Sequence, residues 1–168
     1  MSNKTIIIAD NQDITRLGLV HIIQSQFSYA DILEADNKEQ VEILLKKSDN
    51  AVVIIDPSLF NIHPTEDILS LAQAYNKVQW LIFSNDISDV STRRFSSFQN
   101  ISILLKACNQ DEISSAIVLS LGHQRFICHQ LMDLLLNNER PNDTALAELS
   151  PTEKEILRLT AMGKSVKE

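Results

Sequence analysis

Four short apolar segments, each followed by a polar residue, constrain the fold of this chain most strongly. The segments span residues 5–9, 51–55, 80–83 and 101–105, and the residues that follow them are Asp10, Asp56, Ser84 and Lys106. Short runs rich in Ile and Val are typical of strands that are buried on both faces of a parallel sheet. Because ligands of such sheets bind outside the carboxyl ends of the strands, we expect two carboxylates, a hydroxyl and an ammonium group to converge in one crevice.

The segments between these runs have helical spacing, and a weaker strand is expected at residues 30–33. The expected helices cover residues 14–27, 38–47, 65–75, 87–98 and 111–121. In the first helix, Ile14, Leu17, Leu19, Ile23 and Phe27 should form the apolar side. Strand and helix alternate five times, which predicts a doubly wound α/β domain with a five-stranded parallel sheet. Right-handed crossovers then favour the flavodoxin-like strand order 2-1-3-4-5, with the first and third strands adjacent.

Composition excludes several classes of protein. The chain has 168 residues, 44% of them apolar, and a formal net charge of −7, which argues against a protein that coats nucleic acid. Its longest apolar segments are strand-sized, and the N-terminus leads straight into a strand, so we expect neither a membrane span nor a signal peptide. The sequence has no glycine-rich phosphate-binding motif. Cys108 and Cys128 have no metal-binding spacing, and we expect two free thiols.

Residues 123–148 should form an extension and a linker rather than a further strand–helix unit. They hold a strand-like Phe126–Ile127, an apolar helix at Leu131–Leu136 and a polar stretch at 137–147. A second unit begins near residue 149, where Ser150-Pro151-Thr152-Glu153 combines a capping box with Pro at the first helical position. Another helix opens at Ser165, and the chain ends at Glu168. We expect residues 149–168 to be the incomplete start of an all-α unit.

With these residues in place, the chain resembles two-component response regulators of the LuxR-type (NarL/FixJ) family. The intervals between Asp10, Asp56, Ser84 and Lys106 are 46, 28 and 22 residues, as in the CheY-like receiver domains of that family. The resemblance implies a receiver at residues 1–122, with Asp56 as phospho-acceptor, Ser84 as switch hydroxyl and Lys106 as partner of the phosphate or carboxylate. Residues 149–168 resemble the start of the LuxR-type helix-turn-helix domain.

The family pattern also implies a magnesium site, and this chain departs from it. The ligands would be Asp10, Asn11, Asp56 and the backbone carbonyl of Ser58. Asn11 stands where the family has a second acid, so we expect weaker affinity, because Mg²⁺ prefers charged oxygen ligands. Pro57 directly follows the acceptor and predicts an altered loop at 57–64. Ile103 replaces an aromatic residue that swings inward on activation in this class.

Two readings of function follow. In the first, the chain is a DNA-binding transcriptional regulator that receives a phosphoryl group on Asp56 from a sensor histidine kinase, with homodimerisation open. Residues 149–168 lack a recognition helix, so binding to DNA would need the complete C-terminal domain. In the second, a degenerate receiver acts as a phosphorylation-independent dimerisation or docking module that controls DNA binding.

We do not expect an enzyme, because a phosphatase of this topology needs a second acid where Ser58 stands. The expected location is the cytoplasm, without a membrane partner.

Overall fold

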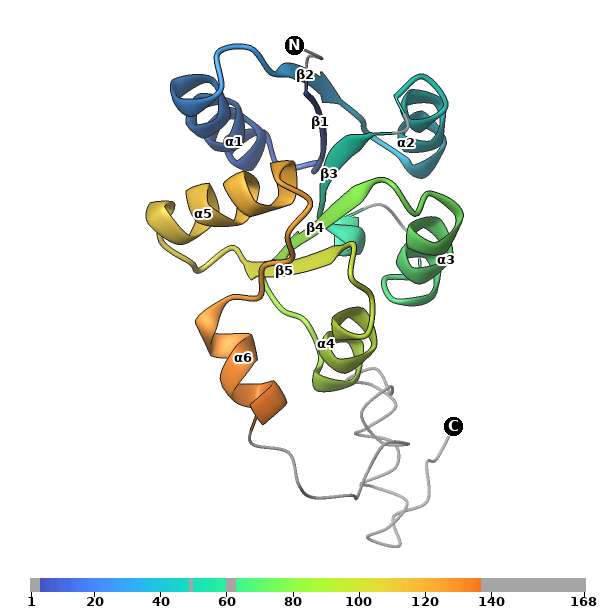
Figure 1. The fold of residues 1–168 in the computed structure, drawn as a ribbon, viewed down its shortest axis with the longest axis vertical. Coiled ribbons are helices and arrows are strands. Elements are labelled where there is room, and N and C mark those ends of the chain that lie inside the picture. Colours follow the sequence, from blue (N-terminus) through green and yellow to red (C-terminus); the bar gives the residue numbers. More distant parts are fainter. Residues whose placement is uncertain (1–3, 49, 60–62, 137–168) are drawn as a thin grey trace, which may run out of the picture.

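A computed structural model describes residues 4–48, 50–59 and 63–136, and these residues form a parallel sheet with helices on both faces (Figure 1). The strands are β1 (Thr5–Ala9), β2 (Asp31–Glu34), β3 (Ala51–Ile55), β4 (Gln79–Ser84) and β5 (Ile101–Leu105). The helices are α1 (Asp13–Gln26), α2 (Lys38–Leu45), α3 (Glu66–Ala74), α4 (Asp89–Ser96), α5 (Gln110–Leu121) and α6 (His129–Leu136), with a 3-10 turn η1 at Pro57–Leu59. The predicted alternation of strand and helix is confirmed.

The sheet has the strand order β2-β1-β3-β4-β5, as the sequence predicts, and every pairing is parallel. In the register of β1 with β3, Ala9 pairs with Ile55. Asp10 directly follows Ala9, and Asp56 directly follows Ile55. Their carboxylates are therefore neighbours at the same edge of the sheet. This adjacency of the first and third strands is what creates the crevice.

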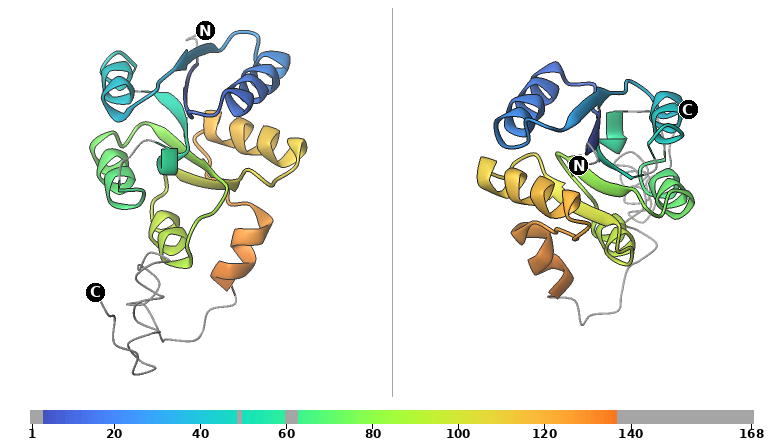
Figure 2. Two further views of the ribbon diagram at one scale, coloured as in Figure 1. Left: turned by 180° about the vertical axis from the view of Figure 1, so that it is seen from behind. Right: turned by 45° about the horizontal axis from the view of Figure 1, so that its top comes forward.

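Helices cover the sheet in two layers, with α1 and α5 on one face and α2, α3 and α4 on the other (Figures 1 and 2). The central strands β1, β3 and β4 are buried almost throughout, while β2 at the edge is largely exposed. The exposure of β2 explains why the sequence signal for a strand at 30–33 is weak. The strand itself lies one residue later, at Asp31–Glu34. A strand at the edge of the sheet is less covered by helices than a central strand, so it needs fewer apolar side chains.

The apolar side of α1 is narrower than predicted. Leu19 and Ile23 are buried and Phe27 is half-buried against the core, but Ile14 is 79% exposed and Leu17 is 66% exposed. The prediction that Ile14 and Leu17 face the core is therefore wrong. At about 100° per residue, Leu19, Ile23 and Phe27 follow one another along one side of the helix, whereas Ile14 lies about 180° and Leu17 about 120° from Ile23. The core covers only the first of these sides.

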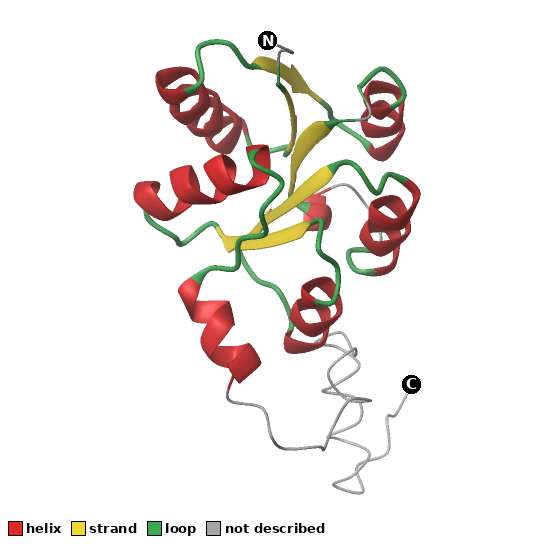
Figure 3. Ribbon diagram, viewed as in Figure 1, coloured by secondary structure: helices red, strands yellow, loops and turns green. Residues whose placement is uncertain are grey.

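The chain does not leave the domain after α5. Ile103 donates its N–H to the carbonyl of Phe126 at 2.8 Å and accepts from the N–H of Cys128 at 3.0 Å, which forms a parallel bridge between Ile103 and Ile127. We call residues 123–128 the strap, because they cover the outer edge of β5. After the strap, α6 packs beside α4 (Figure 3). The strand-like character predicted at Phe126–Ile127 is confirmed.

Helix α5 ends in a motif that places a non-glycine residue in the left-handed region. Gln124 donates its N–H to Leu119 at 2.8 Å and His123 donates to Ser120 at 3.0 Å, the two bonds of a Schellman motif. Gly122 follows the helix as predicted, but its φ is −86°. The left-handed residue is His123, with φ 57°.

Several predictions concern segments that lie outside the described residues. They are the linker at 137–147, the LuxR-type segment at 149–168 and part of the loop at 57–64. Within the described ranges, no helix has the length and apolar character needed to span a membrane.

Candidate functional site

The four polar residues predicted from the strand ends come together at the carboxyl edge of the sheet. Asp10 follows β1 and Asp56 follows β3, and each is only 1% exposed. The N–H of Asp56 donates to the carbonyl of Ala9 at 3.1 Å, which continues the ladder by one step and fixes the spacing of the carboxylates. Ser84 ends β4 and is buried, and Lys106 follows β5.

The ammonium group of Lys106 lies between the two carboxylates. Its Nζ is 2.7 Å from Oδ2 of Asp10 and 2.9 Å from Oδ2 of Asp56. It also donates to Oε1 of Gln12 at 2.9 Å. The N–H of Lys106 donates to the carbonyl of Ser84 at 2.9 Å, so the turn after β5 is tied to the end of β4. This backbone bond directs the lysine inward, where paired carboxylates compensate the cost of burying its charge.

The other oxygen of Asp56 is held by donors. Oδ1 accepts from the hydroxyl of Ser58 at 2.6 Å, from the N–H of Ser58 at 3.1 Å and from the hydroxyl of Ser84 at 3.0 Å. Burial by itself raises the pKa of Asp56, but the bonds from Ser58, Lys106 and Ser84 outweigh it and lower that pKa below its ordinary value. The carboxylate is therefore ionised at neutral pH.

Two contacts of the site were missed by the sequence reasoning. The metal-binding role of the Ser58 carbonyl stays a prediction, and in addition the hydroxyl and the N–H of Ser58 both donate to the Asp56 side chain. The available signal was the Asp-x-Ser spacing, since Asp accepts readily from the N–H two residues later. The backbone N–H of Gln12 donates to Oδ1 of Asp10 at 2.8 Å, and its side-chain Oε1 accepts from the ammonium group of Lys106. Nothing in the sequence marks an exposed glutamine as part of a site.

The crevice has the charge and the donor atoms to attract a cation. Two buried carboxylates and one ammonium group leave one negative charge. In the described part of the chain, no group of three or more His, Cys, Asp and Glu residues could hold a metal ion. A divalent ion would therefore depend on Asp10 and Asp56, completed by neutral oxygens and water, a ligand set that Mg²⁺ accepts. Asn11 directly follows Asp10 in the sequence and is exposed.

Ile103, which the sequence singled out as a departure, is fully buried in the middle of β5. Its backbone is bonded to the strap on the outer side, and its Cα is paired with Ile82 of β4 on the inner side. An aliphatic side chain in this position is part of the core. It has no polar atom that could reach Ser84.

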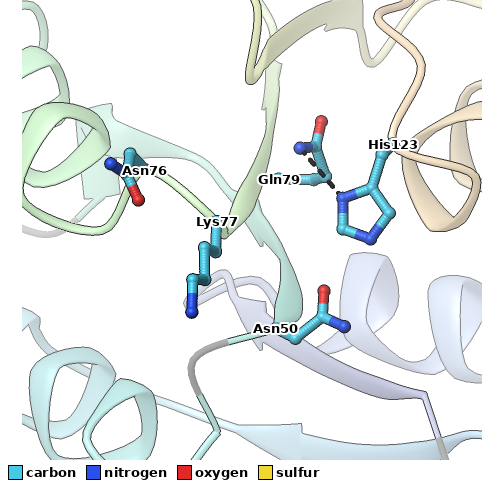
Figure 4. Close-up of a pocket in the computed structure, with 5 residues that line it drawn as sticks. All are labelled: Asn50, Asn76, Lys77, Gln79 and His123. Carbon is cyan, nitrogen blue, oxygen red and sulfur yellow. Dashed lines mark hydrogen bonds between the residues drawn. The ribbon is translucent and has the colours of Figure 1, made fainter.

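Two of the cavities in the described part of the chain lie at opposite ends of the sheet. One of about 210 Å³ adjoins the site and is lined by Ser58 and Ser84 together with residues of the β4–α4 loop and α4. The other, of about 410 Å³, lies at the amino ends of β3 and β4 and is lined by polar residues (Figure 4). There Nε2 of Gln79 is 3.3 Å from Nδ1 of His123. Because this second cavity is remote from the carboxyl ends of the strands, it does not belong to the crevice.

Comparison with known proteins shows the fold. No family model matches the chain, and no curated protein matches it in sequence. Among solved structures, the RcsB response regulator of Salmonella typhimurium is similar with a TM-score of 0.69 and 21% identity, over 97% of this chain and 80% of that one. A LuxR-family response regulator from Aurantimonas has a TM-score of 0.69 and 20% identity, over 80% of this chain and 96% of that one.

A third similar structure is the response regulator ChrA of a heme-sensing two-component system, with a TM-score of 0.57, 23% identity and coverage of 98% of this chain and 78% of that one. The isolated receiver domain of RcsB is also similar, with a TM-score of 0.67 over 79% of this chain. The described domain thus has the receiver fold, as the resemblance in sequence predicted. At these identities the likeness is one of fold.

Proposed function

We propose that this chain is a response regulator of transcription whose receiver accepts a phosphoryl group on Asp56 from a sensor histidine kinase. The observation that carries the proposal is the convergence of an ionised, buried carboxylate with a hydroxyl and an ammonium group within 3.0 Å. Catalysis of phosphoryl transfer depends on positioning and on neutralising the oxygens of the transferred group. The receiver folds of RcsB and the LuxR-family regulator support the class of protein.

The chemistry follows from the groups present. An oxygen of Asp56 would attack phosphorus as the bond to the donor imidazole breaks, and the new bond is an acyl phosphate. Lys106 and Ser84 now bind the free carboxylate, and the same ammonium and hydroxyl groups would then bind the phosphoryl oxygens. A bound Mg²⁺ would supply further charge neutralisation, held by Asp10 and Asp56 with Asn11 and the Ser58 carbonyl as neutral ligands. The affinity of the site for Mg²⁺ should be low, because only two of these oxygen ligands are charged.

The output we propose is control of DNA binding. Phosphorylation would draw Ser84 and Lys106 toward the new charge and so shift the β4–α4 loop and the turn before α5. The C-terminal segment at 149–168 would belong to a LuxR-type DNA-binding domain. RcsB has been solved as dimers bound to DNA, which supports homodimerisation here. These partners imply a cytoplasmic protein.

A second candidate is a phosphorylation-independent docking module that controls DNA binding. It is favoured by the contacts within the crevice, where the polar groups are already paired with one another. Lys106 bridges both carboxylates, and Oδ1 of Asp56 accepts three hydrogen bonds. The exposed Ile14 and Leu17 on α1 would then offer apolar surface to a protein partner.

One experiment separates the two candidates. The protein is titrated with Mg²⁺ and then with beryllofluoride while the fluorescence of Trp80 is followed; this residue is fully buried on β4, the strand that leads to Ser84. Labelling by a small phosphodonor is measured in parallel. Asp56→Asn should abolish both responses, and Asp133→Asn, which changes an exposed acid on α6, should retain them. If the wild type neither responds at millimolar Mg²⁺ nor becomes labelled, the docking module is the better account.

A further inference from the structure

The cavity at the amino ends of β3 and β4 is lined by side chains that all carry N–H donors (Figure 4). Its volume is about 410 Å³, and its lining residues are Asn50, Asn76, Lys77, Gln79 and His123. Three amides, an ammonium group and an imidazole therefore meet at one end of the sheet, and none of the five residues is acidic. The volume suits a small molecule, since ligand pockets usually measure roughly 300–1,000 Å³.

Gln79 is the buried part of this lining, and its amide is incompletely paired. It is 7% exposed, whereas the other four lining residues are exposed. Its Nε2 lies 3.3 Å from Nδ1 of His123, but Oε1 has no hydrogen-bond partner among the described residues. A buried amide without its bonds costs stability, and an aliphatic side chain of similar size would avoid that cost. Packing therefore does not account for a glutamine at this position.

His123 is a second lining residue that costs stability. Its φ of 57° lies in the left-handed region, and among the described residues no other non-glycine residue has a positive φ. A side chain strains the backbone there, and strain of this kind is concentrated at functional sites. When the amide of Gln79 donates to Nδ1, the hydrogen of the neutral ring is on Nε2. That second nitrogen is then a donor for a ligand.

The turn on the other side of the cavity is fixed by hydrogen bonds. Asn76 and Lys77 are its central residues, and the N–H of Val78 closes it by donating to the carbonyl of Tyr75 at 3.1 Å. Nδ2 of Asn100 donates to the carbonyl of Val78 at 3.1 Å and to a carbonyl in the last turn of α3 at 3.0 Å. A turn that is held in this way loses little conformational entropy when a ligand binds.

We propose that this cavity binds a small metabolite through a carboxylate or phosphate group. Both groups are anionic and present only acceptor oxygens, which match a lining of N–H donors without an acid. The ligand would offset what the Gln79 amide and the strain at His123 cost the free protein, as expected where function opposes stability. The site lies at the opposite end of the sheet from Asp56, and it does not rest on the proposed function.

The experiment is an NMR titration of the whole protein with inorganic phosphate and, separately, with citrate, in the absence of Mg²⁺. It follows the side-chain amide signals of Asn50, Asn76 and Gln79 and the backbone signals of residues 122–124. Potassium chloride at equal ionic strength is the control. We expect saturable shifts of these signals with at least one of the two anions. Saturation by phosphate alone would identify a phosphate ligand, and saturation by citrate alone a carboxylate ligand.

Three variants locate the binding. Gln79→Met, His123→Gly and Lys77→Met should each raise the dissociation constant of the anion at least about tenfold, the effect of losing one hydrogen bond to a charged group. Lys46→Met, which changes an exposed lysine after α2, should leave it unchanged. Gln79→Met and His123→Gly should keep or raise the unfolding temperature, because they remove an unpaired buried amide and a strained side chain. Loss of binding in these two variants is then not a loss of folding.

Four results would overturn the proposal. The signals could fail to saturate with either anion, chloride could shift them equally, or all three variants could bind the anion as tightly as the wild type. Shifts centred on Asp56 and Lys106 instead would place the anion in the crevice. Because none of these readouts depends on phosphorylation, the test stands whether or not Asp56 becomes labelled.

Discussion

At the scale of single residues, Lys106 is the centre of the site. It is the cation that both buried carboxylates share, and it is connected by its backbone to Ser84. Its side chain also lies over the ring of Phe83, with Nζ 5.9 Å from the ring centroid. One side chain therefore determines the charge balance of the crevice, and its replacement should change stability as well as function.

We predict that Lys106→Met lowers the free energy of unfolding by about 3 kcal/mol at pH 7, because it leaves two buried carboxylates without their cation. The pH dependence should also change sign. In the wild type the pKa of Asp56 is lowered, so its contribution is present above its ordinary pKa of about 4 and is lost as the pH falls. In the variant, repulsion from Asp10 favours protonation, so stability should rise as the pH falls.

The measurement is urea unfolding between pH 4 and pH 7, with Lys46→Met, an exposed lysine after α2, as the matched control. Added Mg²⁺ should restore part of the lost stability of Lys106→Met, since it can replace the ammonium group between the carboxylates. Equal stability of the two variants at pH 7 would mean that the ion pairs of Lys106 contribute little.

At the scale of elements, the end of α5 shows how a local signal can be displaced by one residue. Gly122 indicates a helix end in the sequence, and α5 does end at Leu121. The left-handed position of the Schellman motif is nevertheless occupied by His123. A side chain at this position costs conformational energy that glycine would avoid.

We therefore predict that His123→Gly stabilises the protein by about 1 kcal/mol in thermal or urea unfolding. Gly122→Ala is the matched comparison. It should be neutral or slightly stabilising, because φ at Gly122 is −86° and a Cβ there would be 3.4 Å from the carbonyl oxygen of Leu119. The opposite order, with Gly122→Ala destabilising and His123→Gly neutral, would show that Gly122 is the left-handed residue.

At the scale of the whole molecule, the packed unit extends past the last sheet–helix pair. The strap covers the edge of β5, and Leu131 of α6 is only 5% exposed. Arg125 of the strap additionally donates to the carbonyl of Ser96 at the end of α4. The N–H and the carbonyl of Ile103 are therefore already paired, and they cannot bond to a second chain at this edge of the sheet.

A chain that ends at residue 122 should therefore be less stable than one that ends at residue 136, by at least about 2 kcal/mol, the contribution of one buried large apolar side chain. It should also self-associate through the uncovered edge of β5. Urea unfolding and light scattering of both chains measure this. Two monomers of equal stability would place the end of the folded unit at residue 122.

The positions of most elements and the four polar residues of the crevice could be predicted from the sequence. Strands such as 51–55 and 101–105 are recognisable because both of their faces are buried, and a buried strand needs apolar residues throughout. The order of the strands follows from the handedness of the crossovers. Once the strands and their order are known, the convergence of Asp10, Asp56 and Lys106 at one edge is a geometric consequence.

Only the tertiary structure decided which contacts these residues make. The bond from the Ser58 hydroxyl to Asp56 depends on the shape of one turn, and the bond from Lys106 to Gln12 joins two segments that are distant in sequence. Packing also decided which side of α1 is buried, because the core covers the side that carries Leu19 and Ile23 and leaves Ile14 exposed. Local patterns determine the elements of this protein, and long-range packing determines the chemistry at their ends.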